Sequence, residues 1–526
     1  QNNFTSLIDA NYRDYFSERL VEIGFRKAFK GDWGSESHTK RQGIVQDLNR
    51  LSYNSAISQL RKINLPLEAS AKVIGPRLLH SSQWGIIDPV DTPDGGNVGL
   101  HKHMSIAAKI TRGCSGKPLI EWLRKNINLK LLSETNIDTI ANSTKILLNG
   151  AWIGTITNPE NTINFLKFNR RNALIPVYTS FYWNIANSEI QISTDSGRMC
   201  RPIFYIDEGK PSYENEAIIE KIESNNFSWI ELISGFASKK DPNFSIESCK
   251  LYNKTEDLYS GTPNSLKNSQ AIIEYIDTAE AEGALVAINS DKNNLSMKPY
   301  TNIEIHPSLI LGVMGNQVVF PENNQLPRDL FACGQMRQAV SLYHSNYQTR
   351  IDKMGVVLNY GQIPLIKSRY LKKINKEQHP YGENVIVAIA CYGGYNVEDS
   401  ILFNEGSLKR GLFRTTYYNS YESREESSKV GNSQIDSQFA NIENENVVGL
   451  KPGFDYSNLD KNGIIKEGTI LDDKKVLIGK VMTNIAQPDT SSDSSVFPKK
   501  GQLGYVDKTF ITEGEMGFRL AKVRVR

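Results

Sequence analysis

The chain has 526 residues, enough for several domains, and its 39% hydrophobic and 23% charged residues are ordinary for a globular protein. Its net charge is only +3, which excludes a polycationic chain, so any nucleic-acid-binding surface must be a local patch. The five cysteines form no C-x-x-C pair and no apolar run reaches roughly 18 residues, which argues against a disulfide framework, a cysteine zinc site and a membrane span, and favours a reducing, intracellular compartment.

Two amphipathic helices are predicted near the start. The apolar residues of the first recur at helical spacing and predict packing against a core: Tyr12, Phe16, Leu20 and Ile23. Gly31–Gly34 ends this pattern, and a second helical pattern covers residues 44–60. Basic residues follow the polar side of this second region: Lys40, Arg41, Arg50, Arg61 and Lys62. A solvated basic face and a nucleic-acid contact both fit this pattern.

Residues 67–110 read as loops that carry polar motifs. Leu67–Ile74 is predicted to be a loop of small residues, and Arg77 follows it. The segment Asp91-Thr92-Pro93-Asp94-Gly95 lies further along. His101 and His103 would share one face of a strand, but the sequence offers no evident third ligand for a metal site.

The region from about residue 111 to residue 300 has mixed patterns. Ile146–Gly154 predicts a hairpin, because Asn149-Gly150 supplies the positive φ angles of a type I′ turn. Residues 190–194 and 201–204 predict strands, whereas residues 260–269 and 291–296 predict loops.

A long helix is predicted after residue 335. Its apolar stripe steps by three or four residues and is formed by Met336, Val340, Tyr343, Tyr347, Ile351 and Met354. Arg337 and Gln338 lie off this stripe, and Arg328 precedes it. Taken alone, Arg328 reads as an ordinary surface charge.

The segment 384–405 carries the most distinctive chemistry. Val385–Cys391 is short, apolar and rich in β-branched residues, which predicts a buried strand. Two glycines permit a tight turn before Glu398 and Asp399. A rigid strand would then deliver two adjacent carboxylates to a loop tip, as in Mg²⁺ sites that also hold phosphates. A solvated acidic turn fits the same spacing.

The last part of the chain is predicted to mix strands with loops. Residues 421–446 read as a mobile polar segment, and residues 486–495 as a loop. Residues 476–481 and 518–525 predict strands. The second of these strands would place Lys522, Arg524 and Arg526 on one face.

Several of these stretches, in their order along the chain, resemble the second-largest (β-type) subunit of multisubunit RNA polymerases. They are Gly-Asp-Trp-Gly at 31–34, Val-Gln-Asp-Leu-Asn-Arg at 45–50, Asp-Thr-Pro-Asp-Gly at 91–95, Gln-Leu-Pro-Arg at 325–328, Gln-Met-Arg-Gln-Ala-Val at 335–340 and Gly-Tyr-Asn-Val-Glu-Asp-Ser at 394–400. Asp91 and Asp94 stand where many members have Glu, so each carboxylate is one methylene shorter. The start without Met and the end inside a strand pattern predict an internal fragment. The Asp-Thr-Pro-Asp-Gly wording and the composition rich in Asn, Lys and Ile suggest a large DNA virus or another divergent lineage.

The resemblance implies an α+β, multidomain fold of mixed sheets and helices with a β-rich hybrid-binding and wall core. The implied regions are the end of the protrusion (1–30), the fork (31–110), two external regions (111–203 and 204–303), the first part of the hybrid-binding region (304–414), the wall (415–517) and the start of a second hybrid-binding segment (518–526).

The implied activity is nucleotidyl transfer by a DNA-directed RNA polymerase. Mg²⁺ would be shared with the largest subunit, which supplies three aspartates, while Asp399 and Glu398 would help to place the second ion. Nucleotide and hybrid contacts are expected from Arg328, Arg337, Gln338, Arg77 and Asp94. Wider nucleic-acid contacts are expected from Lys40, Arg41, Arg50, Arg61, Lys62, Lys522, Arg524 and Arg526.

The implied partners are the largest subunit, other polymerase subunits, template DNA, nascent RNA and NTPs, with no membrane and no zinc within these residues. The fragment alone is expected to be inactive. A non-catalytic scaffold that binds nucleic acid remains an alternative, and so does an independent Mg²⁺ phosphohydrolase. The compartment is expected to be intracellular, with nucleus, cytoplasmic viral factory and virion all open.

Overall fold

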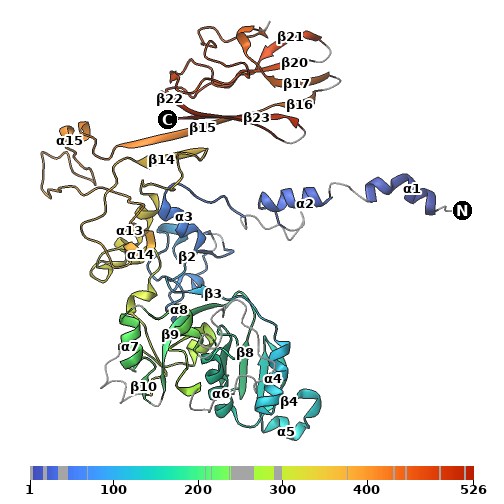
Figure 1. Ribbon diagram of the computed structural model, residues 1–526, viewed down its shortest axis with the longest axis vertical. Helices are drawn as coiled ribbons and strands as arrows, with labels where there is room; N and C mark the ends of the chain where they lie inside the picture. Colours follow the sequence, from blue (N-terminus) through green and yellow to red (C-terminus); the bar gives the residue numbers. More distant parts are fainter. Residues whose placement is uncertain are drawn as a thin grey trace. The chain divides into compact units, whose positions relative to one another are not determined.

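A computed structural model of the chain is shown in Figure 1. It describes residues 4–15, 20–33, 45–67, 69–70, 72–207, 209–214, 216–224, 226–235, 237, 266–289, 299–375, 377–430, 433–444, 447–484, 487–514 and 517–526. The chain divides into two compact units, each built from separate stretches of sequence. Unit 1 comprises Gln1–Gln59, Val340–Gly361 and Ile389–Arg526, and unit 2 comprises Leu60–Ala339 and Gln362–Ala388.

The first sheet of unit 2 has five strands and is covered by two helices. Its strand order is β4-β6-β5-β8-β7. The elements are α4 (Lys117–Ile127), β4 (Lys130–Leu131), α5 (Ile137–Ala141), β5 (Thr144–Leu148), β6 (Ala151–Ile156), α6 (Pro159–Arg171), β7 (Ser180–Asn184) and β8 (Glu189–Ser193). Leu123 of α4 and Leu166 of α6 are fully buried in one core with Ile146 and Ile190 of the sheet. The apolar faces of these two helices therefore pack on the sheet (Figure 1).

The predicted hairpin in this sheet is confirmed. Strand β5 pairs antiparallel with β6, and the two residues between them, Asn149 and Gly150, have φ angles of 49° and 83°. Asparagine and glycine are the residues that adopt this left-handed conformation at least cost, so local turn chemistry sets the register here.

The second sheet of unit 2 is arranged around the long strand β9 (Met199–Asp207). Its other strands are β3 (Lys109–Ile110), β10 (Lys210–Pro211), β11 (Ile273–Asp277), β12 (Val286–Ala287) and β13 (Asn302–Ile303). Nearby helices are α7 (Glu216–Glu223), α8 (Trp229–Ser234) and α11 (Thr278–Glu282). The strands predicted at 190–194 and 201–204 are confirmed in β8 and β9. Of the loop predicted at 260–269, residues 260–265 lie outside the described residues and residues 266–269 form a helical stretch and a turn; the loop predicted at 291–296 lies outside the described residues.

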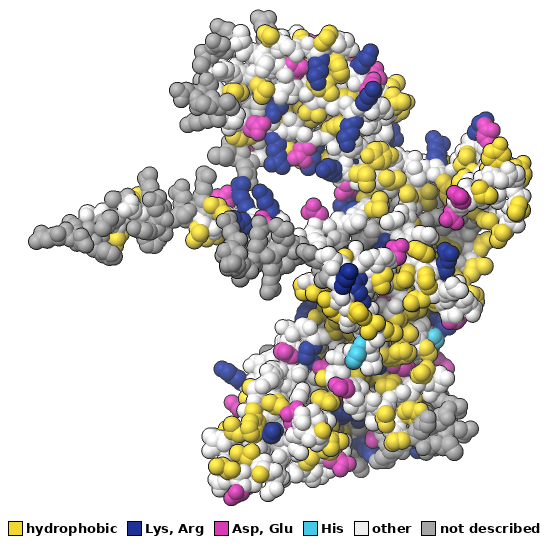
Figure 2. Space-filling view, turned by 180° about the vertical axis from the view of Figure 1, so that it is seen from behind, with side chains coloured by type: hydrophobic (Ala, Val, Ile, Leu, Met, Phe, Trp, Pro, Cys, Tyr) yellow, Lys and Arg dark blue, Asp and Glu magenta, His cyan; other side chains and the backbone are white. Residues whose placement is uncertain are grey.

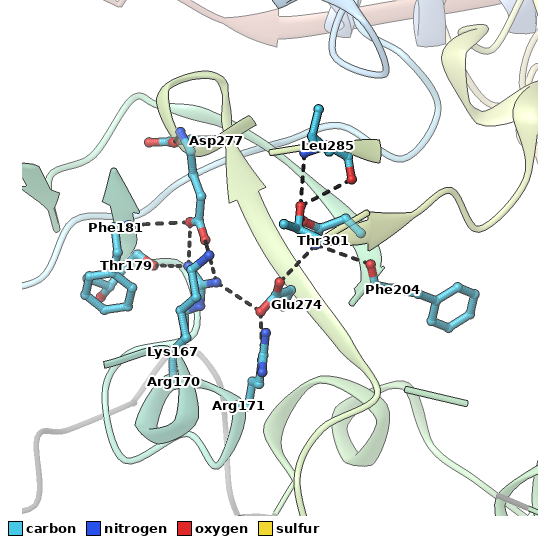
Figure 3. A network of polar contacts seen from close by, with 12 residues as sticks. Lys167, Arg170, Arg171, Thr179, Phe181, Phe204, Glu274, Asp277, Leu285 and Thr301 are labelled. Carbon is cyan, nitrogen blue, oxygen red and sulfur yellow. Dashed lines mark hydrogen bonds and ion pairs between the residues drawn. The ribbon is translucent and has the colours of Figure 1, made fainter. Parts of the chain in front are cut away.

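A buried polar network joins the two sheets of unit 2 (Figure 3). Arg170 of α6 is 1% exposed, and its guanidinium contacts Glu280 of α11 at 2.6 Å and Glu274 of β11 at 3.1 Å. Arg171 donates to Glu274 at 3.0 Å. Burial by itself would raise the pKa of Glu274, but the charges of Arg171 and Arg170 outweigh burial and hold this pKa well below its usual range. The Glu274 carboxylate therefore stays charged and fixes α6 to β11.

Unit 1 contains two five-stranded sheets. The first has the order β14-β15-β23-β22-β19, and Figure 1 shows β14, β15 and β23 side by side. The second has the order β16-β17-β20-β21-β18. Their strands are β14 (Met354–Leu358), β15 (Thr415–Arg424), β16 (Glu426–Val430), β17 (Ser433–Phe439), β18 (Val447–Val448), β19 (Ile470–Leu471), β20 (Lys480–Asn484), β21 (Gln487–Asp493), β22 (Gly504–Glu513) and β23 (Arg519–Val525). One core that includes Phe439, Ile478 and Val523 lies between them.

Three predictions in this part of the chain need correction. The segment 421–446, predicted to be mobile, contains the end of β15 and the hairpin β16–β17. The loop predicted at 486–495 contains β21, which pairs with β20. Of the strand predicted at 476–481, only Lys480 and Val481 lie in β20. Strands β16, β17 and β21 are polar and lack an alternation of apolar and polar residues, so the sequence does not reveal them. Pairing with strands distant in sequence determines them instead. The strand predicted at 518–525 is confirmed as β23.

The helix predictions were also wrong in part. The first predicted helix is confirmed in α1 (Phe4–Tyr15) and α2 (Leu20–Phe29), while Phe16 lies outside the described residues. Helix α2 has no buried residue, so the predicted core packing of Leu20 and Ile23 is wrong. The second pattern yields only α3 (Tyr53–Leu60). The helix predicted from Met336 to Met354 is instead α13 (Leu326–Gln338), and residues 339–353 are not helical. Pro327 occupies the first turn of α13, where its missing N–H and fixed φ are tolerated.

The strand predicted at Val385–Cys391 is absent, because these residues pair with no strand of the described part of the chain. Ile386 and Ile389 are fully exposed, at 104% and 98%. The remaining short helices are α14 (Leu371–Asn375) and α15 (Glu405–Lys409). No helix within the described ranges is both long and apolar enough to cross a membrane. The face shown in Figure 2 carries cationic and anionic side chains mixed with hydrophobic ones, in keeping with the small net charge.

Candidate functional site

The loop that carries Glu398 and Asp399 is shaped by the side chain of Asn396. Asn396 donates from Nδ2 to the carbonyl of Ala390 at 2.6 Å and accepts from the N–H of Tyr392 at 3.1 Å. An amide side chain can satisfy two backbone groups at once, so it replaces the ladder that the predicted strand would have supplied. The predicted glycine turn is present, with φ angles of 59° and 80° at residues 393 and 394.

Glu398 and Asp399 adopt left-handed backbone conformations, with φ angles of 54° and 65°. Two adjacent non-glycine residues in this region cost of order 1–3 kcal/mol each, so the surrounding turn must hold them there. Both residues are exposed, and neither side chain forms an ion pair or hydrogen bond with a residue that the structure describes. The turn therefore presents two unpaired carboxylates to solvent.

These two carboxylates fit a shared Mg²⁺ site better than a complete one. Carboxylate oxygens are the ligands that Mg²⁺ prefers, and one or two of them suffice when phosphates and water supply the rest. Within the described ranges, no group of three or more His, Cys, Asp or Glu side chains is able to hold a metal ion. Any ion held here needs further ligands from outside these residues.

Helix α13 carries the predicted basic residues on two different faces. Asp329, Cys333 and Arg337 are spaced by four residues and therefore lie on one face; the first two are buried and Arg337 is half-buried. Arg328 and Gln338 are exposed on other positions of the helix. Burial, together with the carboxylates of Asp91 and Asp88, raises the pKa of the Cys333 thiol far above its usual range, so this thiol is a packing group.

The buried face of α13 is fixed to the loop that contains Asp91. The Arg337 guanidinium donates from Nη1 to Oδ1 of Asp91, whose side chain is only 2% exposed. The same oxygen lies 3.4 Å from Nδ1 of His103. Burial lowers the pKa of His103 and that of Lys62, which pairs with His103 across strands β1 (Lys62–Asn64) and β2 (His101–His103). His101 instead contacts Asn64, so the two histidines do not share a ligand.

Asp88 ties this loop to the segment just before α13. Its carboxylate accepts from the N–H of Val90 at 2.9 Å and from the N–H of Gly312 at 2.6 Å. A Cβ at Gly312 or Gly315 would lie within 2.8 Å of Oδ2 of Asp88, so glycine permits this close approach. Burial, with the Asp91 charge nearby, raises the pKa of Asp88 to about 7.

Three family models match the chain in sequence order. RNA polymerase Rpb2, domain 3 matches residues 46–110, domain 4 matches residues 146–207, and domain 6 matches residues 314–526. The chain belongs to the Rpb2 family of second-largest RNA polymerase subunits. The resemblance seen in the sequence is thus confirmed, as is the α+β, multidomain fold.

Curated relatives align with nearly the whole chain. The chain is 32% identical to DNA-directed RNA polymerase II subunit RPB2 of Encephalitozoon cuniculi, over 96% of this chain and 42% of that protein. It is 33% identical to DNA-directed RNA polymerase II subunit 2 of Arabidopsis thaliana, over 94% and 40%. It is 29% identical to DNA-directed RNA polymerase subunit Rpo2 of Sulfolobus acidocaldarius, over 92% and 41%. The chain therefore spans less than half the length of these relatives.

Arg61 and Arg77, in the region that the resemblance assigns to the fork, donate hydrogen bonds to backbone carbonyls. Arg77 donates to the carbonyls of Gly96 at 2.6 Å and Val98 at 3.0 Å. Arg61 donates to the carbonyl of Ser105 at 2.5 Å. Asp94 is exposed and makes no side-chain cap to the short helix that follows it. The guanidiniums of Arg61 and Arg77 thus use some of their N–H donors to stabilise the loop.

The C-terminal cations do not form one exposed face, and the expectation for Arg524 needs correction. Arg524 is 3% exposed, and its guanidinium donates to Asp507 at 2.7 Å and to the carbonyl of Gln348 at 2.7 Å. Its charge is therefore used inside the protein and is not presented to nucleic acid. Lys522 pairs with Glu422 at 3.0 Å, and Arg526 is half exposed.

Among the remaining predicted cations, Lys62 is partly exposed and Arg50 is half-buried, while Lys40 and Arg41 lie outside the described residues. Sequence reasoning missed Asp88, His103 as a partner of Asp91, and the turn-closing role of Asn396. The Asn396 role has a local signal, an Asx residue two positions after a glycine pair. The contacts of Asp88 with Gly312 and of Asp91 with Arg337 have none, because these partners are remote in sequence.

Proposed function

We propose that this chain forms part of the active centre of a DNA-directed RNA polymerase and contributes to nucleotidyl transfer. The family membership supports the general role. The observation that carries the finer role is the exposed pair Glu398 and Asp399, which has no partner among the described residues and is held in strained conformations by a turn that Asn396 closes. A backbone strained at a solvent-facing carboxylate pair is typical of functional sites.

In this proposal, Asp399 and Glu398 help to hold a second Mg²⁺ that arrives with the NTP. When bound, the metal ions would neutralise the attacking and leaving oxygens. The carboxylates supply hard oxygen ligands, directly or through water, and the turn keeps them in place without induced movement. The permanent ion belongs to the largest subunit, as the family resemblance implies.

Arg328 is proposed to bind the NTP phosphates or the backbone of the RNA–DNA hybrid. Gln338 is proposed to contact the nucleotide or the hybrid as well. The guanidinium of Arg328 is exposed and lies over the ring of Phe331, 5.8 Å from its centroid. A planar fork of this kind binds phosphate oxygens in pairs. Contacts to phosphates carry no sequence information and fall with salt.

The proposed partners are the largest subunit, other polymerase subunits, template DNA, nascent RNA and NTPs. The region boundaries given above, from the protrusion to the second hybrid-binding segment, and the intracellular location belong to the same proposal. A scaffold subunit that holds nucleic acid without touching the metal remains the second candidate, because the described residues offer no metal group of three ligands.

Reconstitution tests the general role. A full-length subunit containing this chain should assemble with the largest subunit and support templated RNA synthesis, whereas the 526-residue chain alone should make no RNA. Synthesis by the chain alone would overturn the proposal. Substitution of Asp399 separates the catalytic reading from the scaffold reading, since a scaffold would lose folding or binding rather than rate.

A further inference from the structure

Helix α13 presents one face to the protein and another to solvent, and Arg337 lies on the first. Its side chain is 21% exposed, and Nη1 is bonded to a carboxylate that is 2% exposed. Arg328, nine residues earlier, is exposed. The two arginines that the sequence grouped together therefore have different surroundings.

We propose that Asp91 and Arg337 act as a pair of positioning residues, which fix α13 so that its exposed residues, Arg328 and Gln338, meet the nucleotide and hybrid. This inference rests on the proposed function. It assigns Arg337 to the protein side of the helix rather than to a phosphate, and it gives the first aspartate of the Asp-Thr-Pro-Asp-Gly segment a role of its own.

The burial of Asp91 supports the pairing. An ionised carboxylate at this depth is costly unless a charged partner satisfies it, and the Arg337 guanidinium makes the charge-assisted contact. Other titratable groups surround the pair: Asp88, His103, Lys62 and Cys333, from four separate segments of unit 2. Removing either member leaves a partly buried charge unbalanced, so the pair is a two-part anchor.

The geometry of the helix explains how an anchor at one end acts at the other. An α-helix is rigid over 13 residues, the length of α13, so fixing its last turn orients the first. Asp88 holds the chain at Gly312, 14 residues before α13 begins, so the loop that carries Asp91 is itself fixed in place. A misplacement of about 1 Å at a reacting centre can cost a hundredfold in rate, so loss of the anchor should be felt at Arg328.

The length of the side chain at position 91 matters because it sets the position of Arg337 and hence of α13. Glutamate at position 91 would add one carbon–carbon bond, about 1.5 Å, between the loop and Arg337. Asp91→Glu keeps the charge and the ability to pair, so it separates the presence of the ion pair from its position.

A double-mutant cycle in the assembled polymerase tests the pair. Asp91→Asn, Arg337→Gln and the double variant are compared in single-nucleotide addition on a preassembled scaffold, with NTP varied. Each single variant should lower the rate roughly tenfold, and the double variant should be no worse than the poorer single one. The salt dependence of scaffold binding should stay that of wild type. Glu134→Gln, which alters a half-exposed ion pair between Glu134 and Arg124 of α4, serves as the matched control and should change nothing.

A direct phosphate contact by Arg337 predicts the opposite pattern and would overturn the inference. Arg337→Gln would then lower the slope of log affinity against log salt by about one, Asp91→Asn would not, and the effects would add. Folding is checked by deuterium uptake of α13, which should rise in Asp91→Asn and Arg337→Gln and recover in Asp91→Glu. Unchanged deuterium uptake in both variants contradicts the anchor, whether or not the complex makes RNA. A wild-type complex that makes no RNA counts against the proposed function and not against the anchor.

Discussion

Arg170 and Glu280 form a two-pronged ion pair inside unit 2, with Nη1–Oε2 and Nη2–Oε1 distances of 2.6 and 2.8 Å. Their side chains are 1% and 3% exposed, so the pair is shielded from water and salt. It joins α6 of the five-stranded sheet to α11, next to β11 of the neighbouring sheet (Figure 3). The packing of these two sheets thus depends on a charged contact as well as on apolar burial.

Glu280→Gln should therefore destabilise unit 2 strongly. The substitution keeps the shape of the side chain but leaves the buried Arg170 with less compensating charge, and breaking a buried pair costs about 3–5 kcal/mol. Denaturant unfolding followed by tryptophan fluorescence measures this loss, because Trp122 lies in the adjoining core. Glu134→Gln, at a half-exposed pair, should cost about 0.5 kcal/mol or less. Equal losses in the two variants would contradict the role assigned to the network.

Asp88 should make stability depend on pH in a defined direction. Its pKa is raised from 3.8 to about 7 by burial and by Asp91, so the folded state binds this proton more tightly than the unfolded state. The contribution is complete below about pH 4 and is lost as the pH rises through 7. Asp88→Asn cannot ionise, so wild type should lose stability relative to this variant between pH 5 and 8.

Thermal unfolding of both proteins across this pH range is the measurement. As the pH rises, the unfolding midpoint of wild type should fall relative to that of Asp88→Asn. A difference that stays constant with pH would show that Asp88 does not titrate in this window.

Arg328→Ala should impair nucleotide use more than nucleic-acid binding. Arg328 is exposed at the start of α13, whereas Arg337 is half-buried and paired with Asp91. In a reconstituted polymerase, the apparent affinity for NTP should fall while affinity for scaffold DNA stays close to wild type. Lys125→Ala, at an exposed position of α4, is the control for loss of one surface charge. A loss confined to DNA binding would reject the role.

The parts of the fold that followed from the sequence are those that short-range chemistry determines. The hairpin at Asn149-Gly150 needs only two residues with positive φ between alternating segments. The strand at Arg519–Val525 is recognisable from alternation alone, although the fate of Arg524 is not. The burial of the Arg524 guanidinium depends on the backbone carbonyls of residues 347, 348 and 350, which lie on a loop distant in sequence.

The parts that did not follow depend on partners far along the chain. The apolar run at 385–391 reads as a strand, but a strand needs a neighbour, and the described residues supply none. The stripe from Met336 to Met354 has helical spacing, yet the chain leaves the helix after Gln338. Asp91 and Arg337 are 246 residues apart, so no local pattern reports their contact. The resemblance to the family proposed the residues of the candidate site, whereas their division between exposed and buried faces required the structure.

Asp399→Asn tests the central claim most directly. The substitution keeps the size and hydrogen-bonding capacity of the side chain but removes the charge, so single-nucleotide addition should slow while the template–RNA complex stays intact. Each tenfold loss corresponds to about 1.4 kcal/mol, and raised Mg²⁺ should restore part of the rate because weaker metal binding is offset by concentration. The measurement is single-nucleotide addition on a preassembled scaffold with Mg²⁺ and NTP varied. A slower rate that recovers with Mg²⁺ is the predicted result; an unchanged rate with unchanged Mg²⁺ dependence would contradict the account and leave Glu398 and Asp399 as a solvated acidic turn.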